Sequence, residues 1–510
     1  MKNEQRQGNE LEIITNRYTF IKRTLGFWAF AIICCHMLLA TFQYIIPYRN
    51  YRPILRWAGL GLVVFSAVVW CISKKMRQET KQIFRSVRSF ELAMLLGILL
   101  CFLLSCYVNG IGLKRPFIYF YAHDWFLFDS VVCSFLLFPL ACAIGVKQVE
   151  KPIEVFMHVA VIPYTIFTAI CLWHIFHLEV IDFPSGEHGG MTESVQLMLG
   201  FHYNVTGMIA TTLFCLCVYM IFTQNLVVRV LYILLGIIQL VVVYLCNSRT
   251  IFVAVWVFIM IFAFFGTWRL AEKRGFIFRM GASIAVCAGC ATLFWAGRTG
   301  MFILFERVTH FSEELAKERG EISFAGRYYV TSLVAGRDYF IKPLTQTGAE
   351  SARKLTDLSN RMDVWKAAFK VMFSSPKIFF FGVTPAEITD SIWEIGNYHR
   401  EKVAHAHNIL LQIGTGMGVP AMVMFFLFLV SLAIRSVRVM LGKYRSKMQM
   451  KKSYLIPASV LCFVLIDMAE VYLLTRFSVI GCFFFLFAGW IVAVDRKRDD
   501  YVAEDSATIK

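Results

Sequence analysis

Charged residues are scarce in this chain: they make up 17% of its 510 residues, while hydrophobic residues make up 58%. The apolar residues gather in repeated runs of about 20 residues, the length that crosses a bilayer core of roughly 30 Å. A soluble chain of this length usually forms several domains joined by polar linkers. The shortage of charge therefore predicts a multi-pass membrane protein.

The apolar runs also lack the strict alternation that a membrane barrel requires. Backbone polar groups in lipid must be satisfied within each segment, so continuously apolar runs predict an all-α fold. We expect about twelve spans, near residues 27–47, 54–73, 91–109, 124–146, 153–175, 204–222, 228–246, 251–268, 277–297, 409–434, 454–474 and 477–495.

Metal-ligand spacing is missing as well. The chain has 15 cysteines, all inside or beside apolar runs, and none lies in residues 298–408. Cys287 and Cys290 are spaced as a CxxC pair, but they fall inside an expected span and are better explained as core residues. We therefore expect no metal and no cofactor.

Basic residues outnumber acidic ones, which gives a net charge of +17. In a membrane protein such an excess usually lies in cytoplasmic loops, so we expect membrane lipids and no nucleic acid as partners. Placing both termini in the cytoplasm puts most lysines and arginines of the short loops inside. The loop at 176–203 then faces outward, and it contains no lysine or arginine.

One long polar segment interrupts the spans. Residues 298–408 separate the ninth and tenth spans and face outward on this topology. A connection of this length indicates a functional element. Within it we expect helices over 307–320 and 359–376, the second capped by Ser359 and stopped by Pro376. The chain thus divides into a membrane domain at 1–297, an extracytoplasmic loop domain at 298–408, and membrane helices with a cytoplasmic tail at 409–510.

Two arginines stand out on the expected outer side. Arg249 follows Ser248 between two spans that have almost no loop between them, and Arg361 begins an amphipathic helix. A guanidinium group suits phosphate binding, although Arg249 could also reach the lipid head groups and Arg361 could be a solvated surface residue.

Histidines meet the tenth span in the stretch AHAHNILLQIGTGMGVP (404–420). His407 can accept a proton near neutral pH, or it can serve only in capping or packing. Asn408 is suited to cap the span. If this stretch is helical, His405 and His407 cannot share a face, so only one would point into a site.

Two carboxylates, Asp467 and Glu470, lie three residues apart in the expected eleventh span. On a helix they would share one face. They could form a structural ion pair, orient an arginine, or line a polar cavity.

Three features together resemble the O-antigen ligase and polymerase superfamily of bacterial membrane glycosyltransferases. They are the SRT stretch at 248–250, the RxxxW stretch at 361–365, and the His–Asn pair at 407–408 followed by closely spaced glycines. GFHYNVTGM (200–208) is similar to a further stretch of that family, with Tyr203 in place of a frequent proline.

The resemblance implies a GT-C-like fold and an enzyme that transfers or polymerises a glycan. The donor would be an undecaprenyl-diphosphate-linked glycan and the acceptor a sugar hydroxyl, on a lipid anchor or a growing chain, at the outer face of the cytoplasmic membrane. Catalysis would be inverting and independent of metal, with Arg249 and Arg361 holding the diphosphate and His407 as base. The expected substrate-binding residues are Ser248, Asn408, Asn204, Trp365 and Glu470.

A lipid-linked glycan flippase or another multi-pass transporter is the alternative. Many spans and intramembrane carboxylates would suit it, but transporters commonly contain internal repeats, and none is visible here.

Overall fold

The computed structural model describes residues 89–110, 131–132, 134–139, 141–142, 146–182, 188–191, 197–199, 202–310, 361–398, 405–442, 447–474 and 478–508. Within these residues the chain is mostly helical, as expected. The expected spans at 27–47 and 54–73 lie outside the described residues, as does much of the one at 124–146.

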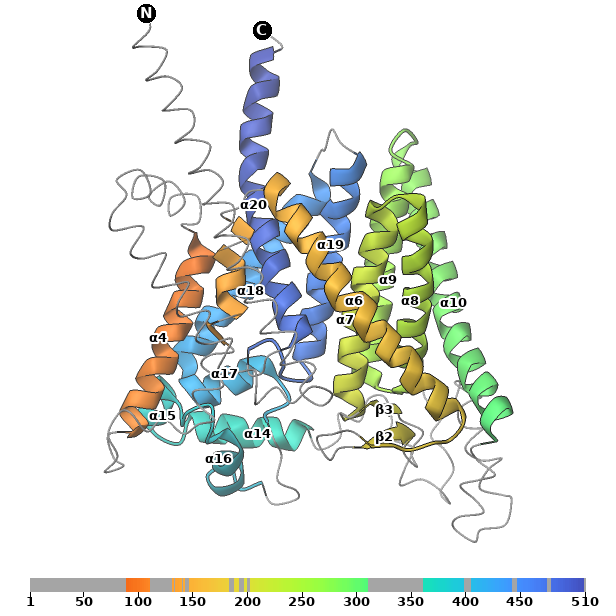
Figure 1. Cartoon of the computed structure of the whole chain (residues 1–510). Helices are drawn as coiled ribbons and strands as arrows, with labels where there is room; N and C mark the ends of the chain where they lie inside the picture. Colours follow the sequence, from red (N-terminus) through yellow and green to blue (C-terminus); the bar gives the residue numbers. More distant parts are fainter. Residues whose placement is uncertain are drawn as a thin grey trace, which may run out of the picture.

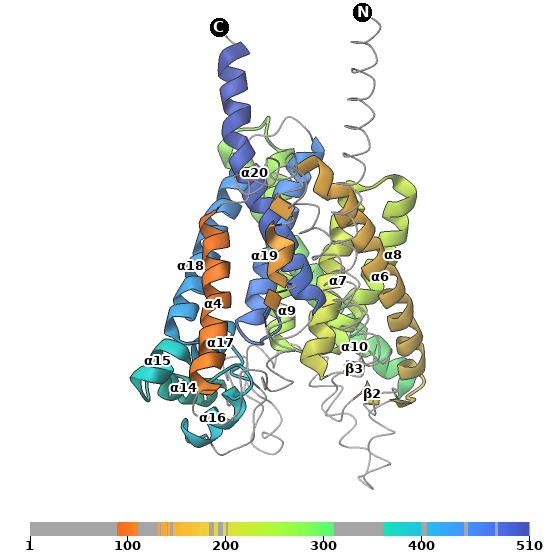
Figure 2. The ribbon, with the colours of Figure 1, turned by 60° about the vertical axis from the view of Figure 1, so that its left-hand side comes forward.

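Long helices form a single bundle (Figures 1 and 2). Eight helices in the described part of the chain are long and apolar enough to cross a membrane. They are α4 (Phe90–Gly110), α6 (Val146–Phe176), α7 (Tyr203–Thr223), α8 (Leu226–Leu245), α9 (Arg249–Leu270), α10 (Phe276–Thr309), α18 (Val419–Leu441) and α20 (Val479–Thr508). A ninth helix, α19 (Lys447–Asp467), packs among them.

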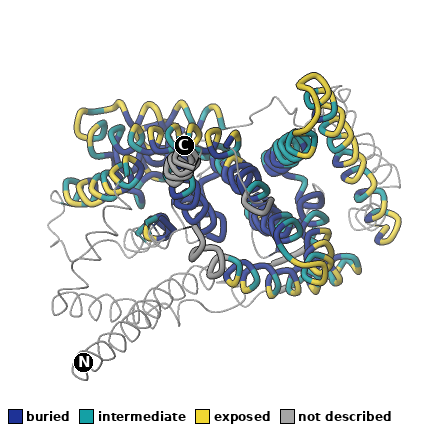
Figure 3. The backbone as a smooth tube through the Cα atoms, turned by 90° about the horizontal axis from the view of Figure 1, so that it is seen from above, coloured by how far each residue is buried: buried dark blue, intermediate teal, exposed yellow. Residues whose placement is uncertain are grey.

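The middle of the bundle is filled by aromatic rings. Phe485 of α20 packs at 5.1 Å from Phe135, and Phe483 stacks at 5.1 Å on Phe156, measured between ring centroids. Many residues of α8 and α10 are apolar and exposed, among them Val227, Leu234, Ile277 and Leu293. Figure 3 shows exposed residues along the helices at the edge of the bundle. Helices that are apolar on every side suit a lipid environment.

The loop at 176–203, which the topology expects to face outward, contains a small antiparallel sheet that the all-α expectation did not include. Strand β2 (His188–Met191) lies between β1 (Ile181–Asp182) and β3 (Leu197–Leu199). The backbone N–H of Leu199 donates to Oγ1 of Thr206, which ties the sheet to the first turns of α7.

Three short helices occupy the described part of the long polar segment. They are α14 (Arg361–Met372), α15 (Pro376–Phe381) and α16 (Ile388–Glu394). Pro376 follows the end of α14, as expected, and it is also the first residue of α15, which Ser375 caps. The ninth expected span ends later than residue 297, because α10 continues to Thr309. Ser359 and most of the helix expected at 307–320 lie outside the described residues.

The expected tenth span, 409–434, is not one continuous helix. It consists of α17 (Ile409–Met417) and α18, separated at Gly418, whose φ is +91°. A Cβ at Gly418 would meet the carbonyl oxygen of Phe380 at 2.3 Å. The break lets α15 pack closely against the α17–α18 junction.

The expected eleventh span also ends early, because α19 stops at Asp467. The Asp467 carboxylate accepts hydrogen bonds from the backbone N–H groups of Tyr472 (2.6 Å) and Leu473 (3.1 Å). These bonds hold residues 468–473 in a turn outside the helix. Glu470 therefore lies after the end of the helix, and the prediction of one helix that contains both carboxylates was wrong.

Candidate functional site

Glu470 is the centre of a polar cluster at the end of the bundle where α7, α9, α14 and α17 begin. Its side chain is only 2% exposed. Oε1 of Glu470 accepts hydrogen bonds from Nδ2 of Asn204 (2.6 Å) and from the Arg361 guanidinium (2.7 Å). One carboxylate oxygen thus connects the start of α7 with the start of α14.

The other oxygen of Glu470 faces two imidazoles. Oε2 lies 3.5 Å from Nδ1 of His407 and 3.8 Å from Nε2 of His405. The two rings lie 4.2 Å apart between centroids. The expectation that only one histidine points into the site was wrong, because residues 405–408 are not helical and His407 has a φ of +51°.

The histidines differ in how their nitrogens are used. Nδ1 of His405 accepts the backbone N–H of His407 at 3.2 Å, so the proton of a neutral His405 lies on Nε2, facing Glu470. His407 directs Nδ1 toward Glu470, and this nitrogen is buried without a direct hydrogen bond among the described residues. A proton on Nδ1 beside the carboxylate would leave Nε2 of His407 as its basic nitrogen.

The charge of Glu470 is stabilised by its neighbours. Burial alone would raise the pKa of this carboxyl group. The adjacent His407, His405 and Arg361 outweigh burial, and the net pKa lies below the ordinary glutamate value. Glu470 is therefore a carboxylate at neutral pH.

Arg361 also reaches the turn between α8 and α9. Its Nη1 donates to Oγ1 of Thr250 at 3.2 Å. Two residues earlier, Oγ of Ser248 donates to Oδ1 of Asn204 at 2.7 Å. Arg249 lies between these anchored residues as the first residue of α9 and is half-buried. The structure thus brings the turn that carries Arg249 to the cluster around Glu470.

The remaining expected site residues support the backbone around His407. Asn408 caps α17 by accepting the N–H groups of Leu410 and Leu411, and its Nδ2 donates to the carbonyl of Met468. Nε1 of Trp365 donates to the carbonyl of His407 at 3.3 Å. Both residues hold the segment that carries His407.

His202 is a neighbour of the cluster that sequence reasoning did not select. Its Nδ1 accepts the N–H of Asn204 at 3.4 Å, and burial lowers its pKa, against the opposing effect of Glu470. The signal in the sequence was its place in the stretch GFHYN, two residues before Asn204.

His405, His407 and Glu470 are the described residues that could together hold a metal ion, since their ligand atoms lie within 4.8 Å of one another. The hydrogen bonds favour another use of these groups. His405 would have to give up the Nε2 proton, which its bond from the His407 backbone places there, and Arg361 already brings positive charge to Glu470. The cluster is better suited to moving a proton beside an anion.

Several groups of positive charge lie near the Glu470 carboxylate. Helices α7, α9, α14 and α17 all begin here, and helix N-termini carry partial positive charge. Arg361 and Arg249 add two full charges. An anionic group next to an imidazole base is the ligand that this arrangement favours.

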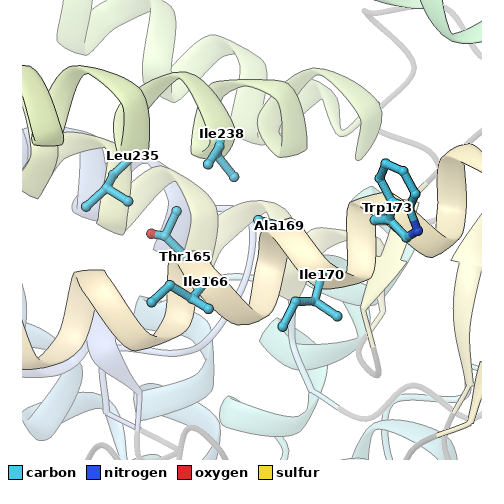
Figure 4. A pocket seen from close by; sticks show the side chains of 7 residues that line it. All are labelled: Thr165, Ile166, Ala169, Ile170, Trp173, Leu235 and Ile238. Carbon is cyan, nitrogen blue, oxygen red and sulfur yellow. The ribbon is translucent and has the colours of Figure 1, made fainter.

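An apolar cavity lies apart from this cluster, on the side of α6 that faces α8. It has a volume of about 390 Å³ and is lined by Thr165, Ile166, Ala169, Ile170, Trp173, Leu235 and Ile238 (Figure 4). Its lining contains no ionisable side chain, so it does not extend the polar site.

The O-antigen ligase family model matches residues 233–426, which is less than half of the chain. The match contains Arg249, Arg361 and His407, whereas Asn204 and Glu470 lie outside it. It confirms the resemblance to the O-antigen ligase and polymerase superfamily that the motifs indicated. No curated protein matches the chain.

Together with the membrane-spanning helices, this match supports an O-antigen ligase- or polymerase-like function in a bacterial inner membrane. Such a function implies a lipid-linked glycan and an acceptor as partners.

Proposed function

We propose that the protein transfers or polymerises a glycan from an undecaprenyl-diphosphate-linked donor, in the biosynthesis of a cell-surface polysaccharide. The observation that carries this proposal is the contact of one buried carboxylate, Glu470, with both Arg361 and His407. This contact places a cation suited to a diphosphate beside a base suited to a hydroxyl group.

The diphosphate is held by arginines. Among the described residues, Arg361 donates to Thr250 and Glu470, and a guanidinium has five N–H groups, so further donors remain for phosphate oxygens. Arg249, one residue before Thr250, supplies the second guanidinium. Both stabilise the negative charge that develops on the diphosphate as it leaves.

His407 activates the acceptor. Its Nε2 removes the proton from the acceptor hydroxyl while that oxygen attacks the anomeric carbon of the donor sugar. The bond from this carbon to the diphosphate oxygen breaks on the opposite face, which inverts the configuration. The proton stays on the imidazolium beside Glu470, whose charge stabilises it until it is released. No metal takes part in these steps.

The site faces the outside of the cytoplasmic membrane in this proposal. The opposite end of the bundle carries many basic residues of the described loops and helix ends, among them Arg229, Arg269, Lys273, Arg274, Arg438 and Arg496. Basic residues favour the cytoplasmic side. The C-terminal end of α20 is at that same end (Figure 1).

Single replacements of Arg249, Arg361 and His407 by alanine test the function in a host whose surface glycan depends on this protein. We expect each variant to be inserted in the membrane while glycan stays on its carrier, as complete chains for a ligase or as single repeats for a polymerase. A matched control is His177→Ala, which removes an exposed histidine at the end of α6 whose ring contacts Trp173. Normal surface glycan in the His407→Ala strain would rule out the assignment of His407 as base.

The same cells distinguish the enzyme from a flippase. A flippase variant would leave its lipid-linked glycan on the cytoplasmic side, where an added periplasmic glycan-modifying enzyme cannot reach it. The proposed transferase predicts that the accumulated glycan is accessible from the outside.

A further inference from the structure

Arg298 is a buried arginine that the site described above does not include. It lies on α10, and its side chain is 7% exposed. Its neighbours on the buried face of α10 are Phe294, Phe302 and Phe305. An arginine within an apolar stripe of a membrane helix is costly, and such residues are usually retained for function.

The side chain of Arg298 reaches the turn between α8 and α9. Its Nη2 donates to Oδ1 of Asn247 at 2.6 Å. The guanidinium carbon lies 5.4 Å from the ring centroids of both Phe252 and Phe302. These contacts with Asn247, Phe252 and Phe302 help to fix the direction of the guanidinium plane.

Asn247 needs such support because its backbone is in the left-handed region, with a φ of +50°. Asparagine tolerates this region better than most residues, but the conformation still has to be selected. The residues that follow are Ser248, Arg249 and Thr250. Ser248 donates a hydrogen bond to Asn204, and Thr250 accepts one from Arg361. The direction in which the chain leaves Asn247 therefore affects both contacts and the position at which Arg249 begins α9.

We propose that Arg298 is a positioning residue that holds the α8–α9 turn through Asn247 and so presents Arg249 to the diphosphate of the donor. The inference rests on the proposed function. It assigns Arg298 an indirect part in donor binding, with no part in proton transfer at His407.

The arginine side chain is suited to this task. A leucine or methionine would fill the stripe between Phe294 and Phe302 without the cost of burying a charge. Only a donor could bind Oδ1 of Asn247, and the planar guanidinium can do so while it lies against two rings. Lysine would keep the charge but lose the planar fork.

Transfer kinetics test the proposal. The donor probe is the undecaprenyl-diphosphate-linked glycan isolated from a strain that lacks the protein, and the enzyme is the full chain in lipid vesicles. We expect Arg298→Met and Asn247→Gly each to raise the KM for the donor about 10-fold or more, with the KM for the acceptor unchanged. Glycine accepts the positive φ at 247, so strain does not explain its effect.

The double variant tests the route of action. If Arg298 acts through Asn247, the Arg298→Met/Asn247→Gly protein has a donor KM no higher than that of the worse single variant. Arg298→Lys is expected to restore part of the donor affinity. If Arg298→Met is not recovered in folded form, the donor KM is measured for Asn247→Gly and Arg298→Lys instead.

Arg279→Met is the matched control. Arg279 lies on the same helix, over the ring of Trp268 at 4.1 Å, but it contacts the opposite end of α9. Its loss should leave the donor KM unchanged. An unchanged donor KM in Arg298→Met, multiplying effects in the double variant, or equal rises in donor and acceptor KM would overturn the inference. If Arg249→Ala also transfers normally, the proposed function itself fails.

Discussion

Oε2 of Glu470 lies 3.5 Å from Nδ1 of His407, although 62 residues separate the two in the chain. The carboxylate meets the ring nitrogen that is not needed for base catalysis. A proton on Nδ1 would face this carboxylate, which favours the tautomer in which Nε2 of His407 is basic. Glu470 also binds Arg361, so it joins the proposed base to that arginine.

Glu470→Gln tests this relationship through activity. The amide keeps the size of the side chain but loses the charge that stabilises the imidazolium during transfer. We expect the turnover number to fall about 10- to 100-fold, less than the loss in His407→Ala, with a smaller change in the KM for the acceptor. A turnover number equal to that of the wild type would show that Glu470 does not act on His407.

Acid stability tests the charge of Glu470. Its pKa is lowered in the folded protein, so its ion pair stabilises the fold above the ordinary glutamate pKa of about 4.3 and this stability is lost as the pH falls through the lower folded value. We expect the melting temperature of the wild type to fall more steeply below this pH than that of Glu470→Gln. Parallel curves for the two proteins would contradict the lowered pKa.

The two histidines are expected to differ in importance. His407→Ala removes the proposed base and should reduce transfer by about 100-fold or more. His405→Ala removes the acceptor for the His407 backbone N–H and should reduce it by about 10-fold or less. The measurement is the initial rate of transfer at saturating donor, and a larger loss in His405→Ala would exchange the two roles.

Gly418→Ala tests the break between α17 and α18. A Cβ at this position would meet Phe380 at 2.3 Å, and the φ of +91° is unfavourable for alanine. We expect a loss of stability of about 2 kcal/mol or more, seen as a lower melting temperature and faster proteolysis around α15. Gly281→Ala is the control because open space surrounds its Cβ position, and equal stability of the two variants would contradict the account.

Asn204 should contribute to the stability of the fold, because it links the segment of Glu470 to the segment of Ser248. It donates to Glu470 and accepts from Ser248, so Asn204→Ala leaves buried polar groups on both sides without their partner. We expect a loss of roughly 1–3 kcal/mol in the free energy of unfolding. Ser248→Ala, which removes only one of these bonds, should cost less; the reverse order in thermal unfolding would show that the link to Glu470 contributes little.

The apolar helices were predictable from the sequence because length and hydropathy determine them. The spans expected near 91–109, 204–222, 228–246 and 251–268 correspond to α4, α7, α8 and α9. Long apolar runs leave the backbone no other way to satisfy its hydrogen bonds in lipid.

The approach of Arg361 to His407 was expected only from the family resemblance, because nothing local to either residue indicates the other. Glu470 was selected on the incorrect premise of a continuous helix. The carboxylate of Asp467 instead accepts hydrogen bonds from N–H groups five and six residues further along the chain. Helical periodicity does not predict such bonds. Gly418 was missed as a break because apolar patterning continues across it while the backbone turns. The histidines at 405 and 407 were judged by helical spacing, although the backbone of residues 405–408 is not helical.

Transfer by purified protein in vesicles, using the undecaprenyl-diphosphate-linked glycan as donor, tests the central claim most directly. The measured quantity is undecaprenyl diphosphate released together with the transferred glycan, for the wild type and for Arg249→Ala, Arg361→Ala and His407→Ala. The account predicts release by the wild type and a loss of about 100-fold or more in each variant that is still folded. Release by His407→Ala at the wild-type rate would contradict it.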